Sequence, residues 1–121
     1  MNPYLIEADD DNYVGIMDVP AELFIEGQPT SETWLSAHFS SVNNFKAGIW
    51  IGQPGKINVP TYPVDEIFTI IAGRIELVSN DQSHLVVEGG QSCVVPKGWQ
   101  GVWHTVQKTT KYYVSFDALA Q

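Results

Sequence analysis

Residues 55–73 read Gly-Lys-Ile-Asn-Val-Pro-Thr-Tyr-Pro-Val-Asp-Glu-Ile-Phe-Thr-Ile-Ile-Ala-Gly, and this stretch decides the fold class. It places two acidic residues, Asp65 and Glu66, directly before the apolar run of residues 67–72. The β-branched and aromatic content of this run, and its length of six residues, are typical of a strand covered on both faces. Gly73 is expected to end this strand and turn the chain into the next one.

Glycine and proline divide the rest of the chain into short apolar segments, and none of these segments has a convincing helical periodicity. Strands are expected at residues 33–39, 45–51, 67–72, 74–79, 83–88, 92–95, 102–107 and 111–116, with turns at 40–44, 89–90 and 96–98 and a loop at 52–55. Many short strands at near-even spacing predict an all-β sandwich or barrel.

The length of 121 residues suits one domain whose core needs neither a metal nor a disulfide for stability. The single cysteine, Cys93, cannot form an internal disulfide and is expected to be a small buried hydrophobe. The sequence shows neither a basic-then-apolar leader nor an apolar run of membrane-spanning length. We therefore expect a soluble, cytoplasmic protein.

The net charge of −8 is concentrated in the first quarter of the chain. Residues 1–32 contain eight acids and no lysine or arginine, whereas residues 33–121 contain six acids and six bases. Nucleic acid and anionic lipid both attract basic surfaces, so neither nucleic acid nor a membrane is an expected partner. The favoured interpretation is a solvated, solubilising N-terminal surface, and an acidic recognition site is the alternative.

Two glycine-and-proline patterns sharpen the fold prediction. Glu66 is followed after six residues by Gly73, and Gly90 is followed after five residues by Pro96 and then, one residue later, by Gly98. This spacing resembles the two motifs of the cupin superfamily, a group of small double-stranded β-barrels.

The closer resemblance, over residues 26–116, is to the ureidoglycine-aminohydrolase-like group of small single-domain cupins. The matching positions are Gly27, Pro29, Thr33, Trp34 and residues 47–50, 54–56, 65–66, 73–77, 95–98, 101–103 and 111–114. The resemblance implies a double-stranded β-helix, the jelly-roll or RmlC-like cupin barrel, over residues 26–121. Residues 1–25 lie outside the resemblance, and their composition predicts an acidic N-terminal extension with peripheral strands. The resemblance also implies a ligand site at the barrel mouth and a homodimer. A barrel of this size has room for side chains or one small ligand.

The metal site of the family is the part of the motif that this sequence lacks. The resemblance implies three histidine ligands and one glutamate, and Glu66 stands at the glutamate position. The histidine positions are occupied by Tyr62 and Pro60, or in the longer spacing by Thr61 and Val59, and by Gly101. One carboxylate does not hold a divalent transition metal tightly, so we expect no cofactor. A divalent metal bound through Glu66 is the less favoured alternative.

The candidate site follows from the motif positions that would face the cavity. Period-two alternation from Gly101 points Trp103 and Thr105 inward and His104 outward. Of the other histidines, His84 lies beside a polar hairpin tip and His38 lies on an upstream strand. The candidate catalytic residues are Glu66 and Tyr62, and the candidate ligand-binding residues are Trp50, Trp103, Lys111 and Tyr113.

Glu66 has two interpretations. A glutamate among aromatic side chains with few hydrogen-bond donors is partly desolvated, which would suit it to act as a general acid or base near neutral pH. Tyr62 could then donate a hydrogen bond to a substrate carbonyl. Alternatively, Glu66 is a structural carboxylate held by Lys111, the nearest plausible cation, or by backbone N–H groups. The tryptophans, in the same way, are expected to provide packing volume and cavity wall.

Three functions stay open at this stage. The favoured one is a small cupin that binds a small organic molecule in the barrel cavity without a tight metal. The first alternative is an aminohydrolase-like or isomerase-like enzyme acting on a small nitrogen-containing or carbonyl compound, with Glu66 as acid/base and with or without a metal. The second is a structural dimer module, whose cavity would be filled by its own side chains.

Overall fold

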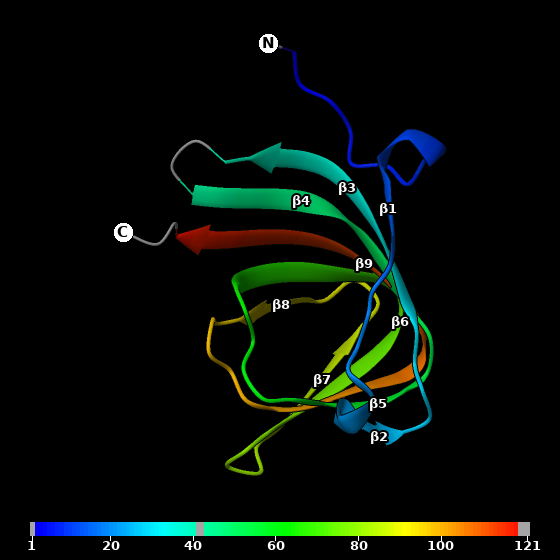
Figure 1. The fold of residues 1–121 in the computed structure, drawn as a ribbon, viewed down its shortest axis with the longest axis vertical. Coiled ribbons are helices and arrows are strands. Elements are labelled where there is room, and N and C mark those ends of the chain that lie inside the picture. Colours follow the sequence, from blue (N-terminus) through cyan, green and yellow to red (C-terminus); the bar gives the residue numbers. More distant parts are fainter. Residues whose placement is uncertain (1, 41–42, 119–121) are drawn as a thin grey trace.

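The computed structural model describes residues 2–40 and 43–118 and shows one strongly curved β-sheet rolled into a barrel (Figure 1). Its elements are η1 (Asp10–Asn12), β1 (Tyr13–Ile16), η2 (Ala21–Leu23), β2 (Phe24–Glu26), β3 (Ser31–Phe39), β4 (Asn43–Gly52), β5 (Gly55–Val59), β6 (Asp65–Ser79), β7 (His84–Glu88), β8 (Ser92–Val95) and β9 (Gly101–Ala118). The prediction of an all-β jelly-roll barrel is confirmed. Within the described residues, no helix is long and apolar enough to cross a membrane.

Two long strands, β6 and β9, form the frame of the barrel. β9 pairs antiparallel with β5 along its first half, with β4 along its second half, and with β6 along nearly its whole length. β6 in turn carries β8 beside its first half and β7 beside its second half. The two long strands therefore hold both halves of the sheet together.

The prediction that Gly73 ends a strand is wrong, and so is the division of the last strand into residues 102–107 and 111–116. β6 runs through Gly73 and β9 runs unbroken, with shifts in their register near the glycine. Gly73 has φ of +110°, and a Cβ atom at this position would lie 2.6 Å from the Cα of Thr109 on β9. The glycine therefore permits a bulge and a close approach of the two strands instead of a turn.

The N-terminal region adds one strand to each edge of the main sheet. β1 pairs with β3, and β2 pairs with β5, so the connecting segment crosses the front of the barrel (Figure 1). The strand β5 was not predicted. The turn expected at residues 40–44 includes residues 41 and 42, which lie outside the described residues. Residue 1 of the expected extension 1–25 and residues 119–121 of the expected cupin domain 26–121 also lie outside them.

A compact apolar core fills part of the barrel. Its buried members are Phe68, Ile70, Ile75, Leu77, Val87, Cys93, Val95, Trp103 and Tyr113. The β6 members project to the same side because side chains alternate along a strand and the bulge restores the inward face after Gly73. Cys93 is 5% exposed, which confirms that it is a small buried residue. The aromatic members of the core continue into an open cavity.

Candidate functional site

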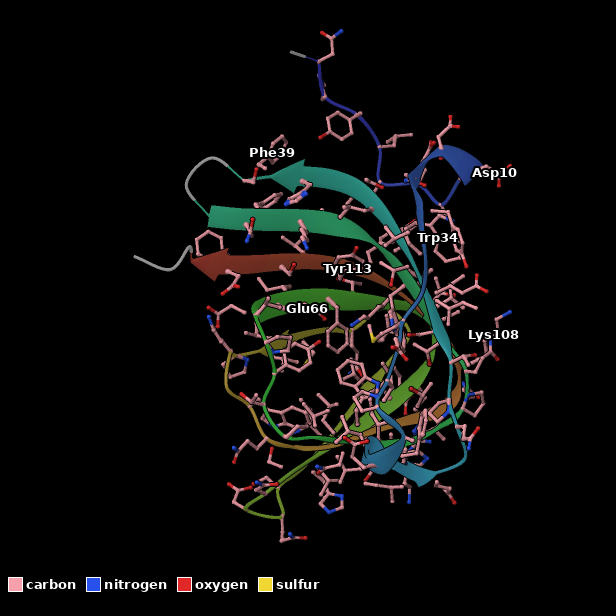
Figure 2. All side chains as sticks on the ribbon, in the orientation of Figure 1. Asp10, Trp34, Phe39, Glu66, Lys108 and Tyr113 are labelled. Carbon is pink, nitrogen blue, oxygen red and sulfur yellow. The ribbon has the colours of Figure 1, made fainter. Side chains whose placement is uncertain are left out.

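A cavity of about 250 Å³ lies beside the core and is lined by side chains from several strands and from the N-terminal segment. All the predicted site residues line it, namely Trp50, Tyr62, Glu66, Trp103, Lys111 and Tyr113. Figure 2 shows Glu66 and Tyr113 inside the barrel, whereas Lys108 lies outside it. The structure thus brings the predicted residues together, and their functional roles stay predictions.

Strand register explains how residues distant in sequence meet in this cavity. Lys111 on β9 lies opposite Trp50 on β4 and opposite Ile70 on β6, two residues beyond Phe68 and four beyond Glu66. Trp103 and Thr105 line the cavity, whereas His104 faces Glu76 on the outer surface at 3.9 Å between Nδ1 and Oε2. The predicted inward and outward alternation is therefore confirmed along this part of β9.

Tyr62 belongs to the connection between β5 and β6, and its backbone is fixed on both sides. Its N–H donates to the carbonyl of Trp99 at 2.8 Å, and its carbonyl accepts from the N–H of Gly98 at 2.8 Å. Its ring stacks on that of Trp103, with centroids 6.1 Å apart and planes inclined by 10°. A loop residue is thereby held in a defined orientation at the cavity wall.

The polar centre of the cavity is an ion pair with a third partner. Lys111 Nζ donates to Glu66 Oε2 at 2.7 Å, and the Tyr62 hydroxyl donates to the same oxygen at 2.9 Å. The lysine and glutamate side chains are only 5% and 10% exposed. No group in residues 2–40 or 43–118 donates a hydrogen bond to Oε1, and no buried side-chain oxygen in this part of the chain lacks a partner. Oε1 has no partner among these residues and so is not fully buried, and the cavity that Glu66 lines is where this oxygen is accessible.

Aromatic rings surround the ammonium group of Lys111. Its Nζ lies 4.9, 4.6 and 4.7 Å from the ring centroids of Trp50, Phe68 and Trp103. Cation–π attraction of this kind favours a charged ammonium, especially where water is excluded. The rings therefore stabilise the cationic partner of the Glu66 carboxylate.

The two tyrosines of the cavity keep their protons at neutral pH. Burial, followed by the nearby Glu66 carboxylate, raises the pKa of Tyr62 far above its usual value. The same two causes raise the pKa of Tyr113 to about 12. The Tyr113 hydroxyl donates to the carbonyl of Trp34 at 3.2 Å, and Trp103 Nε1 donates to Thr105 Oγ1 at 3.2 Å. Both tyrosines therefore act as hydrogen-bond donors, Tyr62 to the Glu66 carboxylate and Tyr113 to the backbone carbonyl of Trp34.

The residues around Glu66 do not fit the metal site of three histidines and one glutamate that the cupin resemblance implies. The histidine positions of that site hold tyrosine, proline, threonine, valine and glycine. At Gly101, a Cβ would already lie 2.6 Å from the Trp99 ring, so there is no room for an imidazole without rearrangement. The Lys111 ammonium already supplies a positive charge to Glu66 Oε2. In the part of the chain that the structure describes, no group of three or more metal-ligating side chains lies together.

Several residues of the cavity were not predicted as site residues. Met17 and Val19 come from the N-terminal segment, Ile57 comes from β5, and Gln53 comes from the loop before it. The alternation of Gly55, Ile57 and Val59 with polar neighbours was a signal for β5. The N-terminal residues carry no comparable signal, because only the path of the chain across the barrel brings them to the cavity.

The fold is shared with several solved structures of low sequence identity. An ethanolamine utilization protein Q from Salmonella typhimurium has a TM-score of 0.62 and 17% identity, with 74% of this chain and 71% of that chain covered. The Clostridium difficile EutQ protein has a TM-score of 0.63 and 15% identity over 84% and 82% of the two chains.

A DUF861 family protein of unknown function from Pseudomonas syringae pv. tomato has a TM-score of 0.70 and 20% identity. The match covers 85% of this chain but 43% of that protein, so this chain corresponds to less than half of it. No curated protein matches the sequence. The model of the EutQ-like cupin domain family matches residues 39–113, which is more than half of the chain. The protein therefore belongs to the EutQ-like cupin domain family.

Proposed function

We propose that this protein binds a small organic molecule in its cavity, with Glu66, Lys111 and Tyr62 as the polar end and aromatic rings as the walls. The ion pair between Lys111 and Glu66 carries the proposal. Removing two charges from water is costly, and apolar side chains of similar volume often give equal or greater stability. A fold that needs only stability has no requirement for this pair, so recognition of a ligand accounts for its presence.

The open volume of the cavity supports the same proposal. A purely structural module would be expected to fill its barrel with its own side chains, because protein interiors are close-packed. The volume of about 250 Å³ lies just below the range of roughly 300–1,000 Å³ typical of sites for drug-sized molecules. A ligand of few atoms suits this space.

An enzyme of the aminohydrolase-like or isomerase-like type is the second candidate, in keeping with the resemblance to the ureidoglycine-aminohydrolase-like group. It is favoured by the arrangement at Glu66, where both donors bind Oε2 and leave Oε1 turned to the cavity. That oxygen could exchange a proton with a bound nitrogen or carbon, and the Tyr62 hydroxyl, once turned away from Oε2, could donate its one proton to a carbonyl. Glu66→Gln separates the two candidates: an enzyme loses turnover while it retains ligand, whereas a binding module changes only in affinity.

A fragment screen followed by NMR tests the binding proposal directly. The four tryptophans give separate indole N–H reporters: Trp50 and Trp103 line the cavity, whereas Trp34 and Trp99 do not. The proposal predicts that at least one small amide, acid or amine shifts the Trp50 and Trp103 signals together. It would be contradicted if no fragment moved them, or if every shift were confined to Trp34 and Trp99.

The quaternary structure and location are further parts of the proposal. The resemblance implies a homodimer, which light scattering on the purified protein would test. A cytoplasmic location is also retained as a prediction, which fractionation of the source cells would test.

A further inference from the structure

We infer that the ligand of this cavity is electrically neutral and carries a hydrogen-bond donor beside an acceptor, as an amide, urea or lactam group does. This inference rests on the proposed binding function and names the chemical class of the ligand.

The charges of the cavity already balance. Among the lining residues that the structure describes, Glu66 is the only one with a carboxyl group and Lys111 the only one with a basic group, and they neutralise each other at 2.7 Å. The other lining residues of the described chain are apolar or carry neutral hydroxyl, amide or phenol groups. A charged ligand would bring an uncompensated charge into a largely apolar space, which is costly because the surroundings cannot solvate it. A neutral ligand avoids this cost.

The polar end of the cavity also offers a ligand one hydrogen-bond acceptor beside a group with free donors. Glu66 Oε1 is an acceptor that faces the cavity, and Lys111 Nζ uses one of its three N–H donors on Oε2. An amide can donate its N–H to Oε1 and accept from Nζ through its carbonyl. A carboxylate has no proton to offer Oε1, and an amidinium has no acceptor for Nζ, so each would leave one group of the pair unsatisfied.

The shape of the cavity suits a flat group. The Tyr62 and Trp103 rings are nearly parallel, and the Trp50 ring meets Trp103 edge-on at 70° with centroids 6.0 Å apart. A planar amide, or a ring attached to one, can lie against such walls with favourable stacking contacts.

The N-terminal segment adds a preference against anions. Met17 and Val19 line the cavity, and the exposed Asp18 lies between them in sequence. The first 32 residues contain eight acids and no lysine or arginine. A field of one sign near an opening lowers the local concentration of ligands of the same sign. The exposed Asp18, next in the chain to two lining residues, therefore adds to the unfavourable environment that an anionic ligand meets in the cavity.

A matched set of three probes tests the inference: benzamide, benzoate and benzamidine. They share a flat ring and a planar head group, and their charges near neutral pH are zero, negative and positive. Titration followed by tryptophan fluorescence and calorimetry should show that the wild-type protein binds benzamide roughly tenfold or more tightly than benzoate. Benzamidine should lie between them, because the acidic N-terminal segment attracts cations.

Two charge changes in the cavity should move this order in opposite directions. Glu66→Gln leaves the Lys111 ammonium uncompensated and should raise affinity for benzoate relative to benzamide by roughly tenfold. Lys111→Met leaves the carboxylate and should favour benzamidine instead. Lys97→Met is the control for Lys111→Met, because it removes the same single positive charge at an exposed site. It should leave the wild-type order of the three affinities unchanged. Wild type and Glu66→Gln suffice for the test if Lys111→Met does not fold.

Three results would overturn the inference. The first is wild-type affinity for benzoate or benzamidine that equals or exceeds the affinity for benzamide. The second is an order that does not change in Glu66→Gln. The third is failure of all three probes to bind the wild type. In each case the indole signals of Trp50 and Trp103 in the fragment screen decide separately whether the proposed binding function survives.

Discussion

Two lysine–carboxylate pairs in this protein have the same N–O distance and very different surroundings. Lys111 and Glu66 meet at 2.7 Å in the cavity with side chains 5% and 10% exposed. Lys97 and Asp117 also meet at 2.7 Å, with side chains 54% and 31% exposed. β9 supplies one member of each pair. Distance alone therefore does not set the contribution of an ion pair, because water screens one pair and is nearly excluded from the other.

The exposed pair keeps both partners solvated, so either can lose the other at little cost. The hydrogen bond and charge of Asp117 raise the pKa of Lys97, which shows that the carboxylate favours the charged amine. In the cavity, each charge depends on its partner because few other groups can stabilise it. The comparison teaches that removing one partner should matter far more inside the barrel than outside.

The largest expected effect comes from removing the buried lysine. Lys111→Met preserves most of the side-chain volume but leaves the Glu66 carboxylate without its cation. We expect the free energy of unfolding near neutral pH to fall by about 3–5 kcal/mol, measured by urea denaturation. The matched change Lys97→Met should have a much smaller effect, because Asp117 remains accessible to water. Equal losses in the two variants would refute the distinction between the pairs.

A smaller effect should follow removal of the third partner of the buried pair. Tyr62→Phe keeps the ring that stacks on Trp103 and deletes only the hydroxyl that donates to Glu66. Because the acceptor is charged, the expected loss in unfolding free energy is about 1.5–3 kcal/mol. Tyr113→Phe is the control: it deletes a hydroxyl that donates to a neutral carbonyl, at an expected cost of about 0.5–1.5 kcal/mol. A larger loss in the control would argue against the central place of Glu66.

The smallest expected effect is absent at neutral pH and appears only in alkaline solution. The pKa of Tyr113 is raised from 10.0 to about 12, mainly by burial. Above pH 10 the unfolded chain loses this proton while the folded chain keeps it, so the unfolded state binds fewer protons and stability falls as pH rises towards 12. Unfolding curves across this interval should show the decline, and the slope should become shallower in Tyr113→Phe. An unchanged slope in that variant would show that this hydroxyl is not responsible.

Much of the cavity could be predicted because strand alternation is a local property. The motif positions implied by the resemblance placed Glu66 at the cavity, and the period of two from the motif position Gly101 placed Trp103 on the inner face and His104 on the outer one. Lys111 was also named as the nearest cation. Its contact with an acid 45 residues away nevertheless depends on the register between β6 and β9, which no local pattern reports.

The errors in the fold prediction have a common physical cause. Gly73 has the composition of a turn, yet its positive φ serves a bulge inside a continuous strand. The polar residues between 107 and 111 similarly suggested a break, although β9 continues through them because β6 and β4 pair on either side. In both places long-range pairing overrides the local signal. Met17 reaches the cavity through a different contact, because its N–H donates to the carbonyl of Ser31 on β3.

The central claim is that the buried pair serves a ligand and is not needed for the stability of the fold. The double variant Glu66→Leu with Lys111→Met tests it most directly, through its free energy of unfolding measured beside that of wild type and of Lys111→Met. The account predicts that the double variant recovers the loss caused by the single change and matches or exceeds wild type, because no unpaired charge remains. A double variant as unstable as Lys111→Met would show instead that the pair is a structural requirement of the barrel.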